Sequence, residues 1–246
     1  VFLSVQSMGQ SSSHYPSWRR SCVSYALPCL APQGAELPPL RILCLPGFGT
    51  NEHIMNFQLM KLFASGISFE HEAMSPIVPT PYPLEPEFRE LTSEPFFKWF
   101  AAAEDGAPEE KELAAAVKAV LRRLEEGRRR RRPFTCILGF SQGCTVADAV
   151  FRASQSLDVA LRGAIFFSGR PASLDPAPDI GKICVVYSNR DVLVPASATK
   201  AFLHIYPNTV EIAHGEGHVM PALAGAQAEK FASYILWQRV GASFVE

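Results

Sequence analysis

The sequence predicts an α/β fold with a mostly parallel central sheet and helices on both faces. Short apolar runs of strand length, such as 41–45 and 135–138, alternate along the chain with longer segments whose apolar residues recur at helical spacing. Apart from their first residues, Arg41 and Thr135, these two runs are apolar, as expected for parallel strands that are covered on both faces. With 246 residues, of which 48% are hydrophobic, the chain is long enough for one such domain with a substantial core.

The amino-terminal residues 1–38 differ in composition from the rest of the chain. They contain many serines, Arg19 and Arg20, and no acidic residue before Glu36. We interpret them as a disordered leader extension, with an organelle transit peptide as the alternative, because such peptides are acid-poor and rich in serine and arginine. The α/β domain is then expected to span residues 39–246.

The domain is predicted to begin with a buried strand at Arg41–Leu45, a turn at 46–50 and a helix from Asn51 onward. A second strand is predicted at Ile67–Ala73. Residues 74–88 contain too many prolines for a helix or a central strand, so we expect a long excursion over the top of the sheet. The excursion leads into an aromatic cluster that consists of Phe96, Phe97, Trp99 and Phe100. These rings are expected either to line a substrate pocket or to pack on the core.

A strongly amphipathic helix is predicted at Glu109–Glu126, with glutamates near its start and arginines near its end, as the helix dipole favours. Gly127 is expected to end this helix. Five consecutive arginines, Arg128–Arg132, follow. We interpret them as a solvated linker, with a nuclear signal or a nucleic-acid patch as the alternative.

The second half of the domain contains four further predicted strands, at 135–138, 162–167, 182–187 and 209–213. Helices are expected directly after the first of these strands, from near Ala196, and at Ala222–Val240. This alternation completes the pattern of an α/β domain.

A serine lies between the strand at 135–138 and its helix, within Gly139-Phe140-Ser141-Gln142-Gly143. The pattern Gly-x-Ser-x-Gly in this setting is typical of a nucleophile elbow, in which a strained serine projects its hydroxyl from the top of the sheet. The glycines are needed because side chains there would collide with the neighbouring strand and helix. Since a helix starts at Gln142, its N–H would point to where an oxyanion forms. Ser141 is therefore the candidate nucleophile.

Two partners for this serine follow later strands. Asp191 lies in the loop after 182–187, and His218 lies in the glycine-rich loop after the last strand, with His214 as the reserve candidate. Ser141, Asp191 and His218 occur in the chain order of the α/β-hydrolase triad. A histidine, with an ordinary pKa of about 6.5, can take the serine proton near neutral pH, and the aspartate would hold the imidazole in the required tautomer. Taken alone, Asp191 has the alternative role of a turn or capping residue.

The loop Gly47-Phe48-Gly49 follows the first strand, where enzymes of this fold place a second N–H for the oxyanion. Phe48 and Gln142 are therefore the candidate oxyanion donors, with an ordinary tight turn as the alternative for the first loop. A phosphate-binding loop is excluded because neither G-x-x-x-x-G-K-[ST] nor G-x-G-x-x-G is present at these residues.

Charge and composition argue against several other classes of protein. The net charge is -1 and the sequence pI is about 6.7, whereas a general nucleic-acid binder carries a strongly basic domain. No apolar run approaches the roughly 18 to 20 residues that cross a bilayer, so we expect no transmembrane helix. The six cysteines form no C-x-x-C, and Cys44, Cys136 and Cys184 lie in predicted strands. We therefore expect no metal, no organic cofactor, no disulfide framework, and a reducing, cytoplasmic location.

Four segments together resemble the FSH1-type serine hydrolases: LRILCLPGFGTN at 40–51, GFSQG at 139–143, DVLVP at 191–195 and GHVMP at 217–221. The resemblance covers about Leu40 to Trp237. It implies a compact α/β-hydrolase with carboxylesterase or thioesterase activity on acyl esters, with Ser141, Asp191 and His218 at the matching positions. Pro46 is a departure, since the family usually has histidine before the glycine of the oxyanion loop.

The expected substrate is a small-molecule acyl ester or thioester that is cleaved through an acyl-serine intermediate. Lysophospholipase or acyl-protein thioesterase activity is the alternative within the same chemistry. A ligand-sensing hydrolase relative with little turnover is the alternative outside the enzymes.

Overall fold

The computed structural model describes residues 40–83, 86–101, 108–157, 161–177 and 181–240. The predicted extension 1–38 lies outside the described residues. In chain order the elements are β1 (Arg41–Leu45), α1 (Glu52–Phe63), β2 (Glu70–Ala73), β3 (Val78–Thr80), α2 (Phe88–Leu91), β4 (Phe96–Lys98), α3 (Glu110–Arg129), β5 (Cys136–Phe140), α4 (Gln142–Ser154), β6 (Gly163–Phe167), β7 (Lys182–Ser188), α5 (Ala196–Ile205), β8 (Thr209–His214) and α6 (Ala226–Val240).

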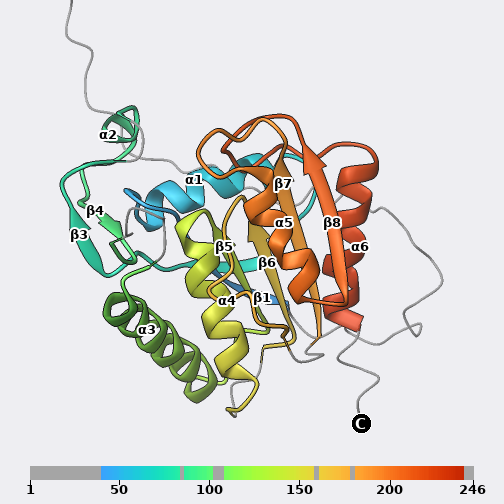
Figure 1. Cartoon of the computed structure of the whole chain (residues 1–246), viewed down its shortest axis with the longest axis horizontal. Helices are drawn as coiled ribbons and strands as arrows, with labels where there is room; N and C mark the ends of the chain where they lie inside the picture. The colour runs from blue at the N-terminus through green and yellow to red at the C-terminus, as the bar shows by residue number, and fades with distance from the viewer. Residues whose placement is uncertain (1–39, 84–85, 102–107, 158–160, 178–180, 241–246) are drawn as a thin grey trace, which may run out of the picture.

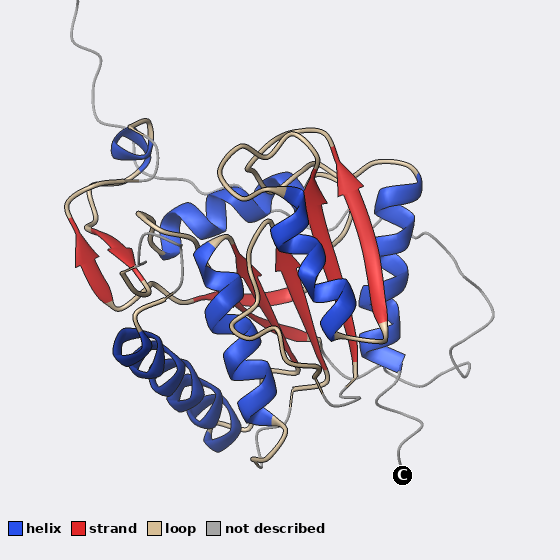
Figure 2. Cartoon of the chain, in the orientation of Figure 1, coloured by secondary structure: helices blue, strands red, loops and turns tan. Residues whose placement is uncertain are grey.

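The main sheet has six parallel strands in the order β2-β1-β5-β6-β7-β8. Helices cover both of its faces (Figures 1 and 2). Helices α3, α4 and α5 share a hydrophobic cluster with one face, and α1 and α6 share a second cluster with the other. Successive strand residues alternate between the clusters, as in Leu43 and Leu45 against Ile42 and Cys44. The predicted fold class is confirmed.

The parallel arrangement brings the carboxyl ends of β5, β7 and β8 to the same edge of the sheet. Loops at this edge carry the chemistry in open α/β sheets. The candidate residues Ser141, Asp191 and His218 follow these three strands, so the topology gathers them at one edge.

The cysteines predicted to lie in buried strands do so. Cys44, Cys136 and Cys184 are fully buried on the face covered by α1 and α6. Burial raises the pKa of all three thiols, that of Cys136 to about 12. They therefore pack as small apolar residues and are not ionised near neutral pH.

The prediction that Gly127 ends its helix is wrong, because α3 continues to Arg129. A Cβ atom at Gly127 would lie 3.0 Å from the Arg132 carbonyl oxygen and 3.1 Å from the Phe134 ring. The glycine therefore allows the following chain to pack closely against the helix. The chain leaves the helix after Arg130, at Arg131, whose φ is 56°.

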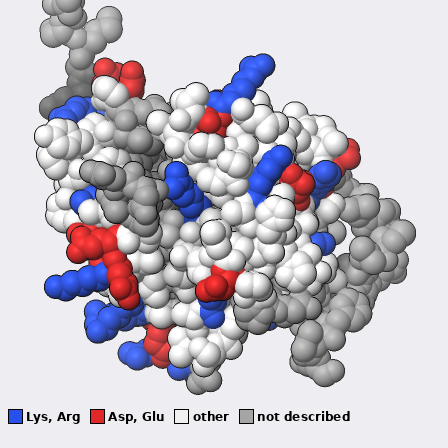
Figure 3. Space-filling model, viewed as in Figure 1, with Lys and Arg blue, Asp and Glu red and all other residues white. Residues whose placement is uncertain are grey.

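The arginine run is only partly the predicted linker, since Arg128 and Arg129 are helical. Both side chains pair with Glu125, at 2.9 and 3.1 Å. Hydrogen bonds from these two arginines lower the pKa of Glu125 to about 2. Arg132 pairs with Glu70 on β2. Figure 3 accordingly shows basic and acidic side chains interspersed where Figure 1 places α3.

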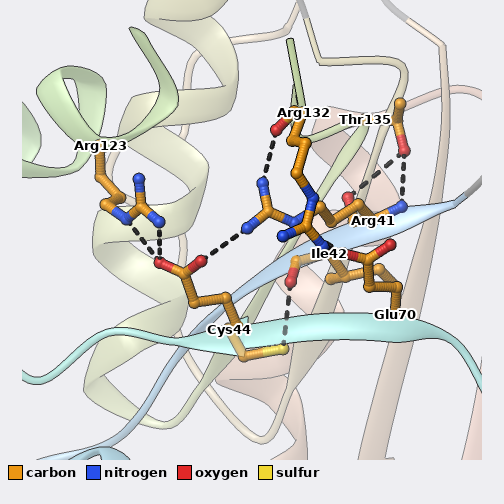
Figure 4. A network of polar contacts seen from close by, with 8 residues as sticks. Arg41, Ile42, Cys44, Glu70, Arg123, Arg132 and Thr135 are labelled. Atoms are coloured by element: carbon orange, nitrogen blue, oxygen red, sulfur yellow. Dashed lines mark hydrogen bonds and ion pairs between the residues drawn. The ribbon is translucent and has the colours of Figure 1, made fainter. Parts of the chain in front are cut away.

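A charged network joins β1, β2 and α3 at the amino ends of the strands (Figure 4). Arg41 is buried and pairs with Glu70 at 3.1 Å and with Glu72 at 2.7 Å, and Arg123 of α3 also pairs with Glu72. The Arg41 guanidinium lies 4.1 Å from the centre of the Phe134 ring. This network lies at the edge of the sheet opposite the candidate site.

The proline-rich excursion forms no part of the main sheet, as predicted. It contains β3, one strand of a separate antiparallel pair with β4, and it ends where the short helix α2 begins. Two predicted starts are wrong. Strand β2 begins at Glu70 and not at Ile67, and α6 begins at Ala226 and not at Ala222. Gly225, with a φ of 52°, prevents an earlier start of α6 because its backbone is outside the helical region.

Candidate active site

Ser141 occupies the turn between β5 and α4. Its φ is 53° and its ψ is -119°, which is a strained backbone conformation for any residue other than glycine. The Ser141 N–H donates to the Phe167 carbonyl at the end of the adjacent strand β6, at 2.9 Å. The neighbouring strand thus holds the turn, as expected for a nucleophile elbow.

The two glycines that flank the serine are required because a side chain at either position would collide with neighbouring backbone, as predicted from the sequence. A Cβ atom at Gly139 would lie 2.6 Å from the Cα atom of Cys144 on α4. A Cβ atom at Gly143 would lie 2.6 Å from the Pro46 carbonyl oxygen, in the loop after β1. Any side chain at either position would push the elbow away from its neighbours.

The three candidate triad residues lie within hydrogen-bond distance of one another. Nε2 of His218 is 2.9 Å from Oγ of Ser141, and Nδ1 of His218 is 2.7 Å from Oδ2 of Asp191. The side chains of His218 and Asp191 are only 6% and 1% exposed, so water barely competes for these contacts. The Phe140 ring packs beside the imidazole, with 5.0 Å between ring centres.

The hydrogen bonds of Asp191 determine the tautomer of His218. Its Oδ1 accepts from the N–H groups of Leu193 and Val194, at 3.0 and 2.8 Å, so both carboxylate oxygens act as acceptors. The neutral imidazole therefore carries its proton on Nδ1, facing Asp191. Nε2 is left with its lone pair directed at the Ser141 hydroxyl, which is the arrangement needed to accept a proton.

Ser188, at the end of β7, connects the loops of the aspartate and the histidine. Its side chain is fully buried, and its Oγ accepts from the N–H of Arg190 at 3.0 Å and of Gly217 at 3.1 Å. Sequence analysis missed this residue. A buried hydroxyl at the end of an apolar strand was the available signal, but its acceptor role toward a residue 29 positions away has no sequence pattern.

The loop after β1 packs directly on Ser141, the candidate nucleophile. A Cβ atom at Gly47 would lie 3.1 Å from the Cβ atom of Ser141. The predicted donor Phe48 is the next residue and is half-buried. The other predicted donor, Gln142, is the first residue of α4, so its N–H has no acceptor within the helix. The assignment of these two N–H groups to an oxyanion hole remains a prediction.

Of the four aromatic residues predicted to line a pocket, three are largely buried. Trp99 is 0% and Phe100 is 3% exposed, and both belong to the cluster beneath α3 and α4. Phe96 packs in a small cluster with Ile54 and Phe88, whereas Phe97 is half-buried. These positions favour the alternative of core packing for Trp99 and Phe100.

A groove along α3 lies away from Ser141. It has a volume of about 810 Å³ and runs along α3, where Leu113, Val117 and Leu121 line it with Ala149 of α4. Since none of the predicted site residues lines it, its size alone does not connect it with the triad.

His214, the reserve histidine, does not reach the serine. Its Nδ1 accepts from the N–H of Glu216 at 3.3 Å, and burial lowers the pKa of its imidazole. Among the described residues no group of three His, Cys, Asp or Glu side chains is arranged to hold a metal ion. No helix in this part of the chain combines the length and the apolar character needed to cross a membrane.

Comparison with known proteins adds a family and a fold. The profile of the serine hydrolase (FSH1) family matches residues 36–229. No individually curated protein sequence shows significant similarity to this chain.

Several solved structures share the architecture. The match to esterase PE8 covers 81% of this chain and 93% of the PE8 chain, with 13% sequence identity and a TM-score of 0.60. The Bacillus cereus carboxylesterase matches 81% and 89%, with 15% identity and a TM-score of 0.59. Acyl-protein thioesterase 2 of Zea mays matches 85% and 96%, with 16% identity and a TM-score of 0.57. At these identities the likeness shows a common fold.

Proposed function

The chain belongs to the FSH1 family of serine hydrolases, and we propose that it cleaves carboxylic esters or thioesters through an acyl intermediate on Ser141. The observation that carries this proposal is the pair of contacts of His218, 2.9 Å to Ser141 Oγ and 2.7 Å to Asp191 Oδ2. A serine hydroxyl is a weak nucleophile unless a base removes its proton during attack. These two contacts support His218 as that base, in the tautomer that proton transfer requires.

In the acylation step, Oγ of Ser141 attacks the carbonyl carbon of the substrate while Nε2 of His218 takes the hydroxyl proton. The carbonyl oxygen becomes an oxyanion, which the N–H groups of Phe48 and Gln142 stabilise. Asp191 stabilises the imidazolium that forms. The tetrahedral intermediate then collapses, the bond to the leaving oxygen or sulfur breaks, and His218 returns the proton to the leaving group.

Deacylation repeats these steps with water. His218 removes a proton from the water as its oxygen attacks the acyl carbon, and the same two N–H groups bind the second oxyanion. Collapse releases the carboxylic acid and returns the proton from His218 to Ser141. The proposed cycle uses only side chains, backbone donors and water.

A fluorophosphonate probe tests the role of Ser141 directly, since it reacts covalently with activated serines. The wild type should be labelled and Ser141→Ala should not. Ser156→Ala is a matched control, because this exposed serine lies just beyond the other end of α4. Equal labelling of Ser141→Ala and the wild type would show that the nucleophile is elsewhere.

The leaving group and acyl chain are addressed by a substrate panel. The fold likeness to an acyl-protein thioesterase and to carboxylesterases motivates p-nitrophenyl esters of increasing chain length, acyl-CoA thioesters, a lysophospholipid and an S-acylated peptide. Turnover of the short esters with wild-type kcat far above that of Ser141→Ala supports the esterase assignment. Thermal stabilisation by these compounds without product release would instead favour a ligand sensor.

A further inference from the structure

The segment 95–100 lies alongside the loop that carries Phe48. Thr50 and Phe97 exchange two backbone hydrogen bonds, at 3.2 and 2.9 Å. The side-chain amide of Asn51 donates to the Pro95 carbonyl at 3.2 Å. The far end of the Phe48 loop is therefore held by a neighbouring strand.

The near end of the same loop is held by Trp99. Proline has no N–H, so the carbonyl oxygen is the only backbone hydrogen-bonding group of Pro46. The indole N–H of Trp99, which is fully buried, donates to this oxygen at 2.7 Å. Pro46 immediately precedes Gly47, the residue that packs against Ser141. Trp99 therefore fixes the loop where it meets the nucleophile.

Trp99 is fixed in turn by the side chain of Gln142. The Gln142 amide oxygen accepts from the Trp99 backbone N–H, and its amide nitrogen donates to the Phe100 carbonyl, both at 2.8 Å. Both ends of this amide are thus used. Gln142 is also the residue directly after Ser141, and its backbone N–H is one of the two proposed oxyanion donors.

We propose that Gln142 and Trp99 are positioning residues that set the geometry of the oxyanion hole. Within the Phe48 loop the Thr50 hydroxyl donates to the Gly47 carbonyl at 2.6 Å. The glycines on both sides of Phe48, of which Gly49 adopts a φ of 64°, still leave the backbone at Phe48 more freedom than side-chain-bearing residues would, so contacts from outside the loop are needed to fix it. The chain of contacts from Gln142 through Trp99 to Pro46 holds the Phe48 N–H at a fixed distance from the Gln142 N–H. This inference rests on the proposed function.

Two variants break the chain of contacts without removing either backbone N–H donor. Trp99→Phe keeps an aromatic ring but removes the indole donor from the buried Pro46 carbonyl. Gln142→Ala removes both hydrogen bonds of the side-chain amide, and the alanine still carries a backbone N–H at position 142. Since a displacement of about 1 Å can cost roughly 10²-fold in rate, we expect kcat per active site to fall by about 10- to 10²-fold with little change in KM.

A pair of esters that differ only in the carbonyl atom separates positioning from stability. Thiono esters place sulfur, a weak hydrogen-bond acceptor, where the oxyanion forms, so an oxyanion hole favours the oxo ester. The wild type should prefer the oxo ester strongly, and both variants should lose about 10-fold or more of that preference. A role in folding alone would lower the midpoint of thermal unfolding or the fraction of active sites and leave the preference unchanged.

Matched controls come from the same chain. Gln155→Ala removes another side-chain amide that donates to backbone carbonyls, at the opposite end of α4, and Trp237→Phe replaces a tryptophan remote from the site. Both should keep the wild-type kcat and oxo-to-thiono ratio. If Trp99→Phe and Gln142→Ala keep the wild-type ratio, the positioning role is wrong. If the wild type hydrolyses neither ester and Ser141 is not labelled, the proposed function itself fails.

Discussion

Replacing Asp191 with asparagine tests how the tautomer of His218 is set. Asparagine has the same shape, but an NH₂ group takes the place of one carboxylate oxygen. Oδ1 of Asp191 accepts two backbone hydrogen bonds, at 3.0 and 2.8 Å, so the amide oxygen of the variant must stay on that side. The NH₂ group of the variant then faces Nδ1 of His218. In the wild type this nitrogen lies 2.7 Å from Oδ2 of Asp191.

A donor that faces Nδ1 stabilises the tautomer with its proton on Nε2, and that tautomer cannot accept the proton of Ser141. Rotating the variant's side-chain amide by half a turn would restore the tautomer with its proton on Nδ1. The backbone N–H groups of Leu193 and Val194 would then face the NH₂ group, which cannot accept a hydrogen bond from them. At about 1–3 kcal/mol for each lost hydrogen bond, the turned form is disfavoured by about 2–6 kcal/mol, a factor of about 30 to 2 × 10⁴. We expect kcat to fall by about 10³- to 10⁴-fold, the upper value being typical of this change in Ser-His-Asp proteases.

The assay is steady-state hydrolysis of a p-nitrophenyl ester from pH 6 to 9, together with thermal unfolding. The unfolding midpoint of Asp191→Asn should stay near that of the wild type, because the two backbone hydrogen bonds are kept. Asp175→Asn, in a loop outside the site, is the control and should keep full activity. A kcat for Asp191→Asn within tenfold of the wild type would refute the tautomer argument.

Three further predictions concern Ser188, Gly143 and the buried Asp148 of α4. Ser188→Ala removes the acceptor of two backbone N–H groups, so urea unfolding should show a loss of about 1–3 kcal/mol and kcat should fall as both loops loosen; an unchanged kcat would contradict this linkage. Gly143→Ala would place Cβ 2.6 Å from the Pro46 carbonyl oxygen and closer still to the Leu45 carbonyl oxygen of β1, so we expect a loss of about 1–3 kcal/mol in unfolding and a lower kcat, whereas full activity would show that the end of β1 and its loop move aside freely. Burial raises the pKa of Asp148, so its contribution to stability is present below the unfolded pKa of about 3.9 and is lost as pH rises through the folded pKa. Urea unfolding from pH 3 to 7 should therefore show the wild type losing stability relative to Asp148→Asn, and a constant difference would contradict the shift.

The positions of the three candidate triad residues could be predicted from sequence because each follows a strand directly. In a parallel sheet the strand ends meet at one edge, so residues such as Ser141 and His218 are brought together without any knowledge of side-chain contacts. Local patterns also predict the glycines of the elbow, since their steric cause lies in the strand-turn-helix geometry.

The contacts that hold the site could not be predicted because they join segments far apart in the sequence. Trp99 and Pro46 are 53 residues apart, and Gln142 lies 43 residues from Trp99. The wrong prediction at Gly127 has the same cause. The glycine is needed because the Phe134 ring packs against it, and it does not mark the end of the helix. Aromatic residues in a proline-rich segment suggested a pocket, whereas the burial of Trp99 depends on tertiary packing alone.

The late position of His218 in the chain affects how the protein behaves during synthesis. A polypeptide leaves the ribosome from its amino terminus, so β1, β5 and β6 can associate before residue 218 has been added. Throughout this interval the nascent chain carries the proposed nucleophile and its oxyanion donors but no base. Under the proposed mechanism, hydrolysis can therefore start only after the loop that follows β8 has been added and has folded, so a translation product that ends before residue 218 is expected to be inactive.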